Sequence, residues 1–111
     1  MPERDRSYTY YYDDTARITV SRKIVRGNVI KFSVSFDILI ETGGWATVTR
    51  IDTHNDVVHR HIFSPMCKQV KVIFICRDYK DGLTQAVKFV ADNYDNLRDN
   101  YLTQMSRRRI T

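Results

Sequence analysis

Apolar and polar residues alternate with a period of two through the first half of the chain. The clearest stretch runs from Ile30 to Ile40, where every second residue is apolar and Lys31, Ser33 and Ser35 fall between them. Successive side chains of a strand point to opposite faces, so this pattern predicts a strand with one buried face. Similar patterns predict strands at residues 15–21, 45–53 and 57–63. An apolar run at residues 70–76 predicts a strand buried on both faces.

Turn-forming residues separate the predicted strands. Gly27-Asn28, Thr42-Gly43-Gly44 and His54-Asn55-Asp56 all contain residue types that tolerate positive φ. Connections this short join antiparallel neighbours, so we expect a mostly antiparallel sheet. The Gly43-Gly44 pair lacks the context of a phosphate-binding loop and reads as a turn.

The period changes to that of a helix after residue 80. Asp81 is expected to cap the helix, and Arg107-Arg108-Arg109 suits its C-terminal end. Apolar residues then recur every three or four positions: Leu83, Val87, Val90, Tyr94, Leu97, Tyr101 and Met105. The prediction is an α+β fold in which about five strands of a mostly antiparallel sheet are packed by one long C-terminal helix.

The chain is short enough to form one domain. It has 111 residues and shows no repeat or linker, so residues 1–111 are predicted to fold together. Residues 1–14 contain four tyrosines and are expected to be either flexible or an edge strand. Residues 106–111 are expected to form a basic tail.

Charge and composition limit the partners and the cellular location that we expect for this protein. Eighteen basic and 13 acidic side chains give a net charge of +5, which is compatible with a polyanionic partner. No apolar run is long enough for a membrane span, and the charged N-terminal residues do not resemble a secretory signal. We therefore expect a cytoplasmic protein with reduced cysteines, Cys76 packing as a small hydrophobic residue and Cys67 having no assigned role.

The three histidines lie within eight residues of each other, and two of them are spaced for one strand face. His59 and His61 should point the same way, with Arg60 pointing to the opposite face. If the chain turns near residue 56, the preceding strand brings Arg50 or Asp52 close to this pair. Which of the two residues meets which histidine depends on the length of the turn.

Such a cluster supports three readings. In the first, the imidazoles act as acid and base on RNA, Asp52 holds one ring in place, and Arg50 or Arg60 neutralises charge on the phosphate. In the second, His59 and His61 begin a metal site that Asp52 or His54 completes. In the third, the histidines are polar surface residues.

The segment from about residue 30 to residue 65 resembles the TumE-like toxins of prokaryotic toxin–antitoxin pairs. In those proteins an aspartate-containing segment precedes a His-x-His pair, and the matching positions here are Asp52, His59 and His61. The resemblance implies a small cytosolic protein encoded beside an antitoxin partner. It does not specify the reaction.

Basic and aromatic residues outside the histidine cluster suit nucleic acid. Arg22, Lys31, Trp45 and Arg60 are the predicted contacts, with Lys31 and Arg60 on the sheet face away from the helix. The leading prediction is a toxin-like protein that acts on RNA as a metal-independent ribonuclease without a cofactor, using His59, His61, Asp52 and Arg50. The alternative is a non-catalytic binding or assembly module that forms a homodimer through its sheet edge or helix.

Overall fold

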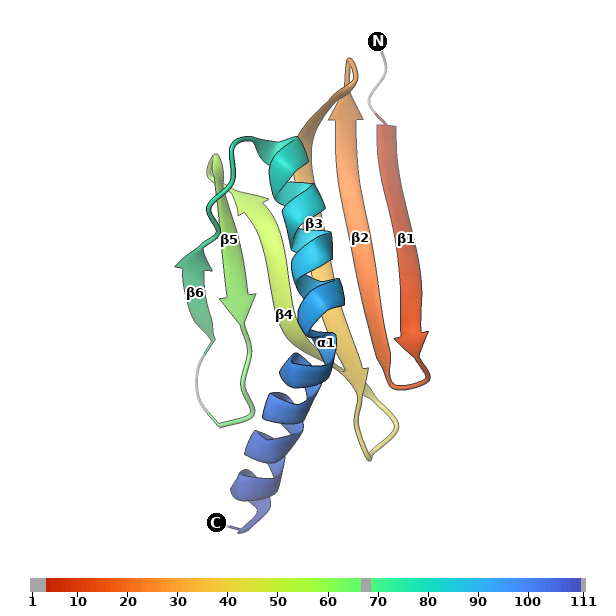
Figure 1. Ribbon diagram of the computed structural model, residues 1–111, viewed down its shortest axis with the longest axis vertical. Coiled ribbons are helices and arrows are strands. Elements are labelled where there is room, and N and C mark those ends of the chain that lie inside the picture. Colours follow the sequence, from red (N-terminus) through yellow and green to blue (C-terminus); the bar gives the residue numbers. More distant parts are fainter. Residues whose placement is uncertain (1–3, 67–68, 111) are drawn as a thin grey trace.

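Six strands precede one helix in the computed structural model, which describes residues 4–66 and 69–110, with the backbone alone at residues 108–110. The elements are β1 (Arg4–Asp13), β2 (Ala16–Val25), β3 (Asn28–Leu39), β4 (Trp45–His54), β5 (Val57–Ile62), β6 (Val70–Ile73) and α1 (Tyr79–Ile110). Each strand pairs antiparallel with the next along the chain, and α1 runs across one face of the sheet (Figure 1). The predicted α+β fold is confirmed. Its sheet has six strands instead of about five because the tyrosine-rich segment forms edge strand β1.

Two tight turns fix the register of the central strands. Arg26 and Gly27 have positive φ between β2 and β3, and Asn55 and Asp56 have positive φ between β4 and β5. Two successive residues with positive φ are typical of the type I′ turn, whose twist matches that of the strands it joins. The turn predicted around Asn55-Asp56 is therefore confirmed, whereas the turn predicted at Gly27-Asn28 lies one residue earlier, because Asn28 begins β3.

The core lies between α1 and the middle of the sheet. Ala86 and Val90 of α1 are fully buried, as are Val34 and Phe36 of β3. Burial of a Val or Phe side chain contributes about 1.5–3 kcal/mol, so this layer supplies much of the stabilisation of the fold. The alternation in β3 thus buries one of its faces, as the sequence predicts.

The two ends of α1 differ from the sequence prediction. The helix begins at Tyr79, and the Oδ1 atom of Asp78 accepts the backbone N–H of Asp81 at 2.8 Å. Asp78 is therefore the cap, and the assignment of that role to Asp81 was wrong. The backbone is helical through residue 110, so α1 includes most of the basic segment predicted as a tail. α1 is not apolar enough to cross a membrane.

Strand β6 was predicted to be buried on both faces, and this was wrong. It has only four residues and forms an edge of the sheet, where Val70, Val72 and Ile73 are exposed. α1 packs mainly over β3 and does not cover this edge. Cys76, farther along, packs against the core as predicted, and burial raises the pKa of its thiol.

Gly82 is required where α1 passes close to the sheet and the preceding loop. A Cβ atom at this position would lie 2.9 Å from Cys76 Sγ and 3.3 Å from the Phe32 ring. Alanine normally favours a helix over glycine by about 1 kcal/mol. We expect Gly82→Ala instead to lower the free energy of unfolding by about 1–3 kcal/mol, measured by urea denaturation, because of overpacking. Adding Cys76→Ala should restore part of the loss, and a stabilised single variant would contradict this account.

A hydrogen-bonded ion pair ties the turn after β1 to α1. Arg98 donates to Asp13 Oδ2 at 2.7 Å and to the Thr15 hydroxyl at 3.1 Å. The Arg98 hydrogen bond, assisted by the Thr15 backbone N–H, lowers the pKa of Asp13 to about 2. Nearby, the ring of Tyr12 stacks on that of Tyr94 with centroids 4.3 Å apart, so the C-terminal end of β1 is held against the helix.

The Asp13 pair predicts a defined acid dependence of stability. Because the pKa of Asp13 is lower in the folded state, its stabilisation is complete above about pH 4 and is lost as the pH falls toward 2. We expect Asp13→Asn to lower the melting temperature at pH 7, and the difference from wild type to vanish near pH 2. Asp14→Asn is the matched control, because Asp14 makes no hydrogen bond to the described residues. Equal effects of the two changes would contradict the role of Asp13.

Candidate functional site

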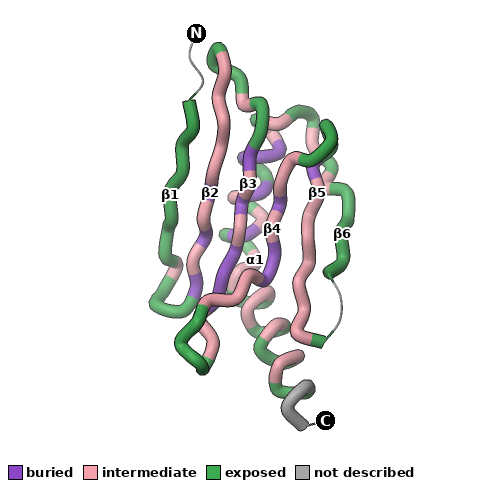
Figure 2. The backbone as a smooth tube through the Cα atoms, turned by 180° about the vertical axis from the view of Figure 1, so that it is seen from behind, coloured by how far each residue is buried: buried purple, intermediate pink, exposed green. Residues whose placement is uncertain are grey.

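The sheet face that α1 leaves uncovered is here termed the open face, and Figure 2 views the sheet from this side. Polar side chains lie on this face in rows across the strands. Cross-strand partners share a face, so the register defines each row. The first row consists of Ser7, Ser21, Ser33, Asp52 and His59. The second row consists of Thr9, Thr19, Ser35, Arg50, His61 and Lys71. Each row therefore leads from hydroxyl groups to one of the two histidines.

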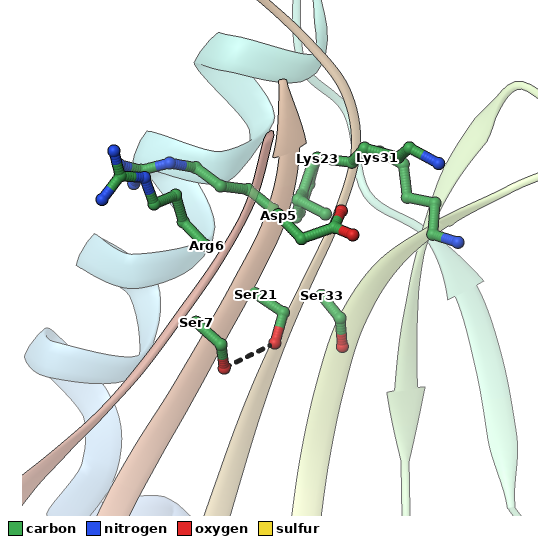
Figure 3. Close-up of a pocket in the computed structure, with 9 residues that line it drawn as sticks. Asp5, Arg6, Ser7, Ser21, Lys23, Lys31 and Ser33 are labelled. Atoms are coloured by element: carbon green, nitrogen blue, oxygen red, sulfur yellow. Dashed lines mark hydrogen bonds between the residues drawn. The ribbon is translucent and has the colours of Figure 1, made fainter. Parts of the chain in front are cut away.

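A shallow hollow lies at the serine end of the first row. It has a volume of about 240 Å³, and Ser7, Ser21 and Ser33 project to the same side of it, with Lys23 and Lys31 nearby (Figure 3). The hydroxyls of Ser7 and Ser21 are hydrogen-bonded at 3.1 Å. Hydroxyl and ammonium groups are donors that suit an anionic or sugar-containing ligand.

A hydrogen-bonded chain of three side chains occupies the histidine end of the open face. Asp52 accepts from Arg50 Nε at 3.1 Å through one oxygen and contacts His61 Nε2 at 2.9 Å through the other. A carboxylate only accepts, so Nε2 of His61 carries the proton in this contact. The sequence left the partners open, and the structure pairs Asp52 with both Arg50 and His61.

Two further side chains hold His61. Its Nδ1 atom lies 3.1 Å from Gln69 Oε1, and its ring stacks on that of Phe63 with centroids 6.3 Å apart. The guanidinium of Arg50 lies 5.6 Å from the same Phe63 ring. Sequence reasoning missed Gln69 and Phe63. The i, i+2 spacing from His61 to Phe63 could have indicated that Phe63 shares its face.

His59 lies beside this chain in a different environment. It is opposite Asp52 in the register, but its Nδ1 atom is buried and has no hydrogen-bond partner among the described residues. The two histidines thus share the open face, as predicted, and differ in their contacts. His61 is held at both nitrogens, whereas the buried Nδ1 of His59 leaves Nε2 as the nitrogen that can meet a ligand.

The covered face of the sheet supports His61 from behind. Arg60 donates from Nε to the Thr49 hydroxyl at 3.2 Å, and this hydroxyl donates to the His61 carbonyl oxygen at 2.8 Å. The Arg60 guanidinium also lies 4.5 Å from the ring of Phe89 in α1. Burial lowers the pKa of Arg60, which has no carboxylate partner within the described residues. Thr49 and Arg60 therefore fix the backbone that carries His61.

The predicted nucleic-acid contacts divide between the two faces. Lys31 lies on the open face, where it is the cross-strand partner of Lys23. Trp45 lies there too, with Arg17 4.0 Å from the centre of its ring. Arg22 shares a face with its neighbour Phe32, which is buried under α1. The placement of Arg60 on the open face was wrong, because strand alternation turns it toward the helix.

The other sequence candidates are not brought to this site. His54 is exposed at the end of β4, and Cys67 lies outside the described residues. Within residues 4–66 and 69–110, no group of three or more His, Cys, Asp or Glu side chains is arranged to hold a metal ion. The donors present at the site are one carboxylate and two imidazoles, which together can accept, hold and release protons.

A comparison with family models gives one match. A model described as a domain of unknown function, DUF7718, matches residues 1–107. The chain belongs to this family. No curated protein and no solved structure matches the chain. Membership in DUF7718 assigns no activity, and it provides no link to TumE-like toxins.

The position of Arg60 in this DUF7718 chain predicts how its loss is tolerated. The Arg60 guanidinium is partly buried without a partner of opposite charge among the described residues, which is costly, so an apolar chain of similar length compensates for the lost contacts. We expect Arg60→Met to unfold in urea within about 1 kcal/mol of wild type. Thr49→Val, which removes the hydrogen bond to the His61 carbonyl, should cost more, about 1–2 kcal/mol. The reverse order would contradict the contacts assigned to the covered face.

Proposed function

We propose that this protein binds RNA on its open face and cleaves it with His59 and His61 as acid and base. One observation carries the proposal: the chain Arg50–Asp52–His61 lies on the open face directly beside His59. A carboxylate that orients an imidazole is the arrangement by which enzymes prepare a histidine for proton transfer.

The rows of the open face supply the binding surface. Hydroxyl groups and lysines are common donors to phosphate and sugar oxygens, and Ser21, Ser33 and Lys31 lie in the hollow at one end. Lys71 continues the second row beyond His61. The net charge of +5 favours approach of a polyanion. Together these features favour a single strand laid across the sheet, from the hollow toward the histidines.

RNA contains its own nucleophile, the ribose 2′-hydroxyl. In the proposed reaction His59 removes the 2′-hydroxyl proton, and the 2′-oxygen forms a bond to phosphorus. The bond from phosphorus to the 5′-oxygen then breaks, and protonated His61 donates its Nδ1 proton to that oxygen, which takes the place of Gln69, while Asp52 keeps Nε2. The products are a 2′,3′-cyclic phosphate and a 5′-hydroxyl.

Asp52 and Arg50 have supporting roles in this proposal. The carboxylate of Asp52 stabilises the positive charge on His61 until the proton is transferred. The side chain of Arg50 is 39% exposed, so its terminal nitrogens can reach the phosphate while Nε is held by Asp52. A guanidinium in that position offsets the negative charge that develops on phosphorus oxygens.

Cleavage of RNA inside a cell would slow growth. We therefore propose that the protein is the toxin of a toxin–antitoxin pair, and that its antitoxin covers the open face. The resemblance to TumE-like toxins at Asp52, His59 and His61 supports this proposal.

The test uses purified protein and a labelled single-stranded RNA of mixed sequence. Wild type should produce fragments with 2′,3′-cyclic phosphate ends in the presence of a metal chelator. We expect His59→Ala/His61→Ala to lower the cleavage rate by at least about 10²-fold, the usual contribution of general acid–base catalysis. RNA affinity, measured by fluorescence anisotropy, should change little.

The matched control is His54→Ala, because His54 is the remaining histidine and is exposed at the end of β4, away from the site. It should cleave like wild type. Intact RNA after incubation with wild type would contradict the catalytic proposal, and RNA binding without cleavage would instead support the non-catalytic binding module. Equal cleavage by the double variant and wild type would remove the histidine assignment.

A further inference from the structure

Strand β1 presents a long free edge in the described part of the chain. It is ten residues long, pairs with β2 on one side, and is exposed at every position except Tyr12. The only irregularity of its pairing lies at its C-terminal end, between Tyr11 and Asp13. An edge strand carries unpaired backbone N–H and C=O groups, and natural proteins usually shorten, bulge or cover such edges. The opposite edge, β6, has only four residues.

The side chains of β1 are divided by charge along its length. On the side of the sheet that faces α1, the first half carries Arg4 and Arg6, and the second half carries Tyr8 and Tyr10. The two tyrosines are 48% and 58% exposed. Tyr8 also borders a hollow with Leu83 and Val87 of α1, and the helix holds β1 through Tyr12 and Asp13. A strand with a cationic half and an aromatic half is complementary to itself when it is reversed.

We infer that β1 pairs antiparallel with β1 of a second copy of this chain, which joins two six-stranded sheets into one. An interface related by a two-fold axis is isologous, so each contact between different residues occurs twice. It sets the arginine half of each strand against the tyrosine half of the other. Cation–π contacts of this kind contribute about 0.5–1 kcal/mol each at exposed sites.

Two registers set arginines against tyrosines without opposing like charges along β1. When the two-fold axis is perpendicular to the sheet, the covered faces of the two copies lie on the same side. Each residue of β1 therefore faces a residue whose side chain points to that same side of the sheet. An axis at Ser7 sets Arg4 against Tyr10 and Arg6 against Tyr8. An axis at Tyr8 sets Arg6 against Tyr10. An axis at Arg6 would set the two Arg6 side chains against each other. An axis at Thr9 would set Asp5 against Asp13.

The helices leave room for this pairing. α1 packs mainly over β3, so two copies of β3 would lie five strand spacings apart, roughly 24 Å. Packed helices approach to about 8–10 Å, so the two helices would not collide. On the other side of the sheet, the two open faces would join, with their Ser7 residues meeting at or near the axis.

The test measures self-association by sedimentation velocity over a range of protein concentrations. Wild type should approach twice the monomer mass. Tyr8→Lys/Tyr10→Lys places cations against Arg4 and Arg6 of the partner, and four lost cation–π contacts should weaken association by about 30-fold or more. Adding Arg4→Glu/Arg6→Glu to this variant should restore the dimer, because the charges then match.

Two controls decide the outcome. Val70→Lys/Val72→Lys changes exposed residues of β6 and should leave the dimer intact. Circular dichroism of each variant checks that the fold is retained. A wild type that stays monomeric, a dimer lost through the β6 change, or no recovery in the charge-matched variant would each overturn the inference. None of these results depends on RNA cleavage.

Discussion

The packing of one apolar stripe of α1 against one face of the sheet determines the rest of the structure. Ala86 and Val90 are fully buried against the alternate residues of β3. Since side chains of a strand alternate, covering one face commits the remaining residues of every strand to the other face. The polar rows of the open face, including the histidines, follow from this single interface.

Both faces of the sheet contribute to the histidine site. On the open face Asp52 joins Arg50 to His61, and on the covered face Thr49 holds the His61 carbonyl. The contacts that Asp52 and Thr49 make with His61 require the register that the Asn55-Asp56 turn sets between β4 and β5. A slip of one residue would turn the histidines toward the helix. The Asn55-Asp56 turn is therefore as important for the histidine site as the side chains that make up the site.

Short sequence patterns predicted those parts of the structure that depend on residues close to each other in the sequence. The alternation at residues 30–40, the apolar stripe from Leu83 and the turn residues predicted the two layers and the antiparallel sheet. They also placed His59 and His61 on one face, near Arg50 and Asp52. The exact pairing required the turn length, because turn type sets register and the sequence allowed more than one type.

The remaining features depend on where elements lie in the sheet. The run at residues 70–76 has the composition of a buried strand, but β6 is at an edge that α1 does not reach. Gln69 meets His61 only because β6 pairs with β5. Asp78 and Asp81 are both suitable helix caps, and their geometry decides between them.

The central claim is that the function of this protein resides on the open face. Titration of ¹⁵N-labelled protein with a short single-stranded RNA, followed by NMR, tests it most directly. The account predicts that chemical-shift changes centre on the amides of Ser21, Ser33, Asp52, His59 and His61. Changes confined to the exposed side of α1, or no changes at any RNA concentration, would contradict it.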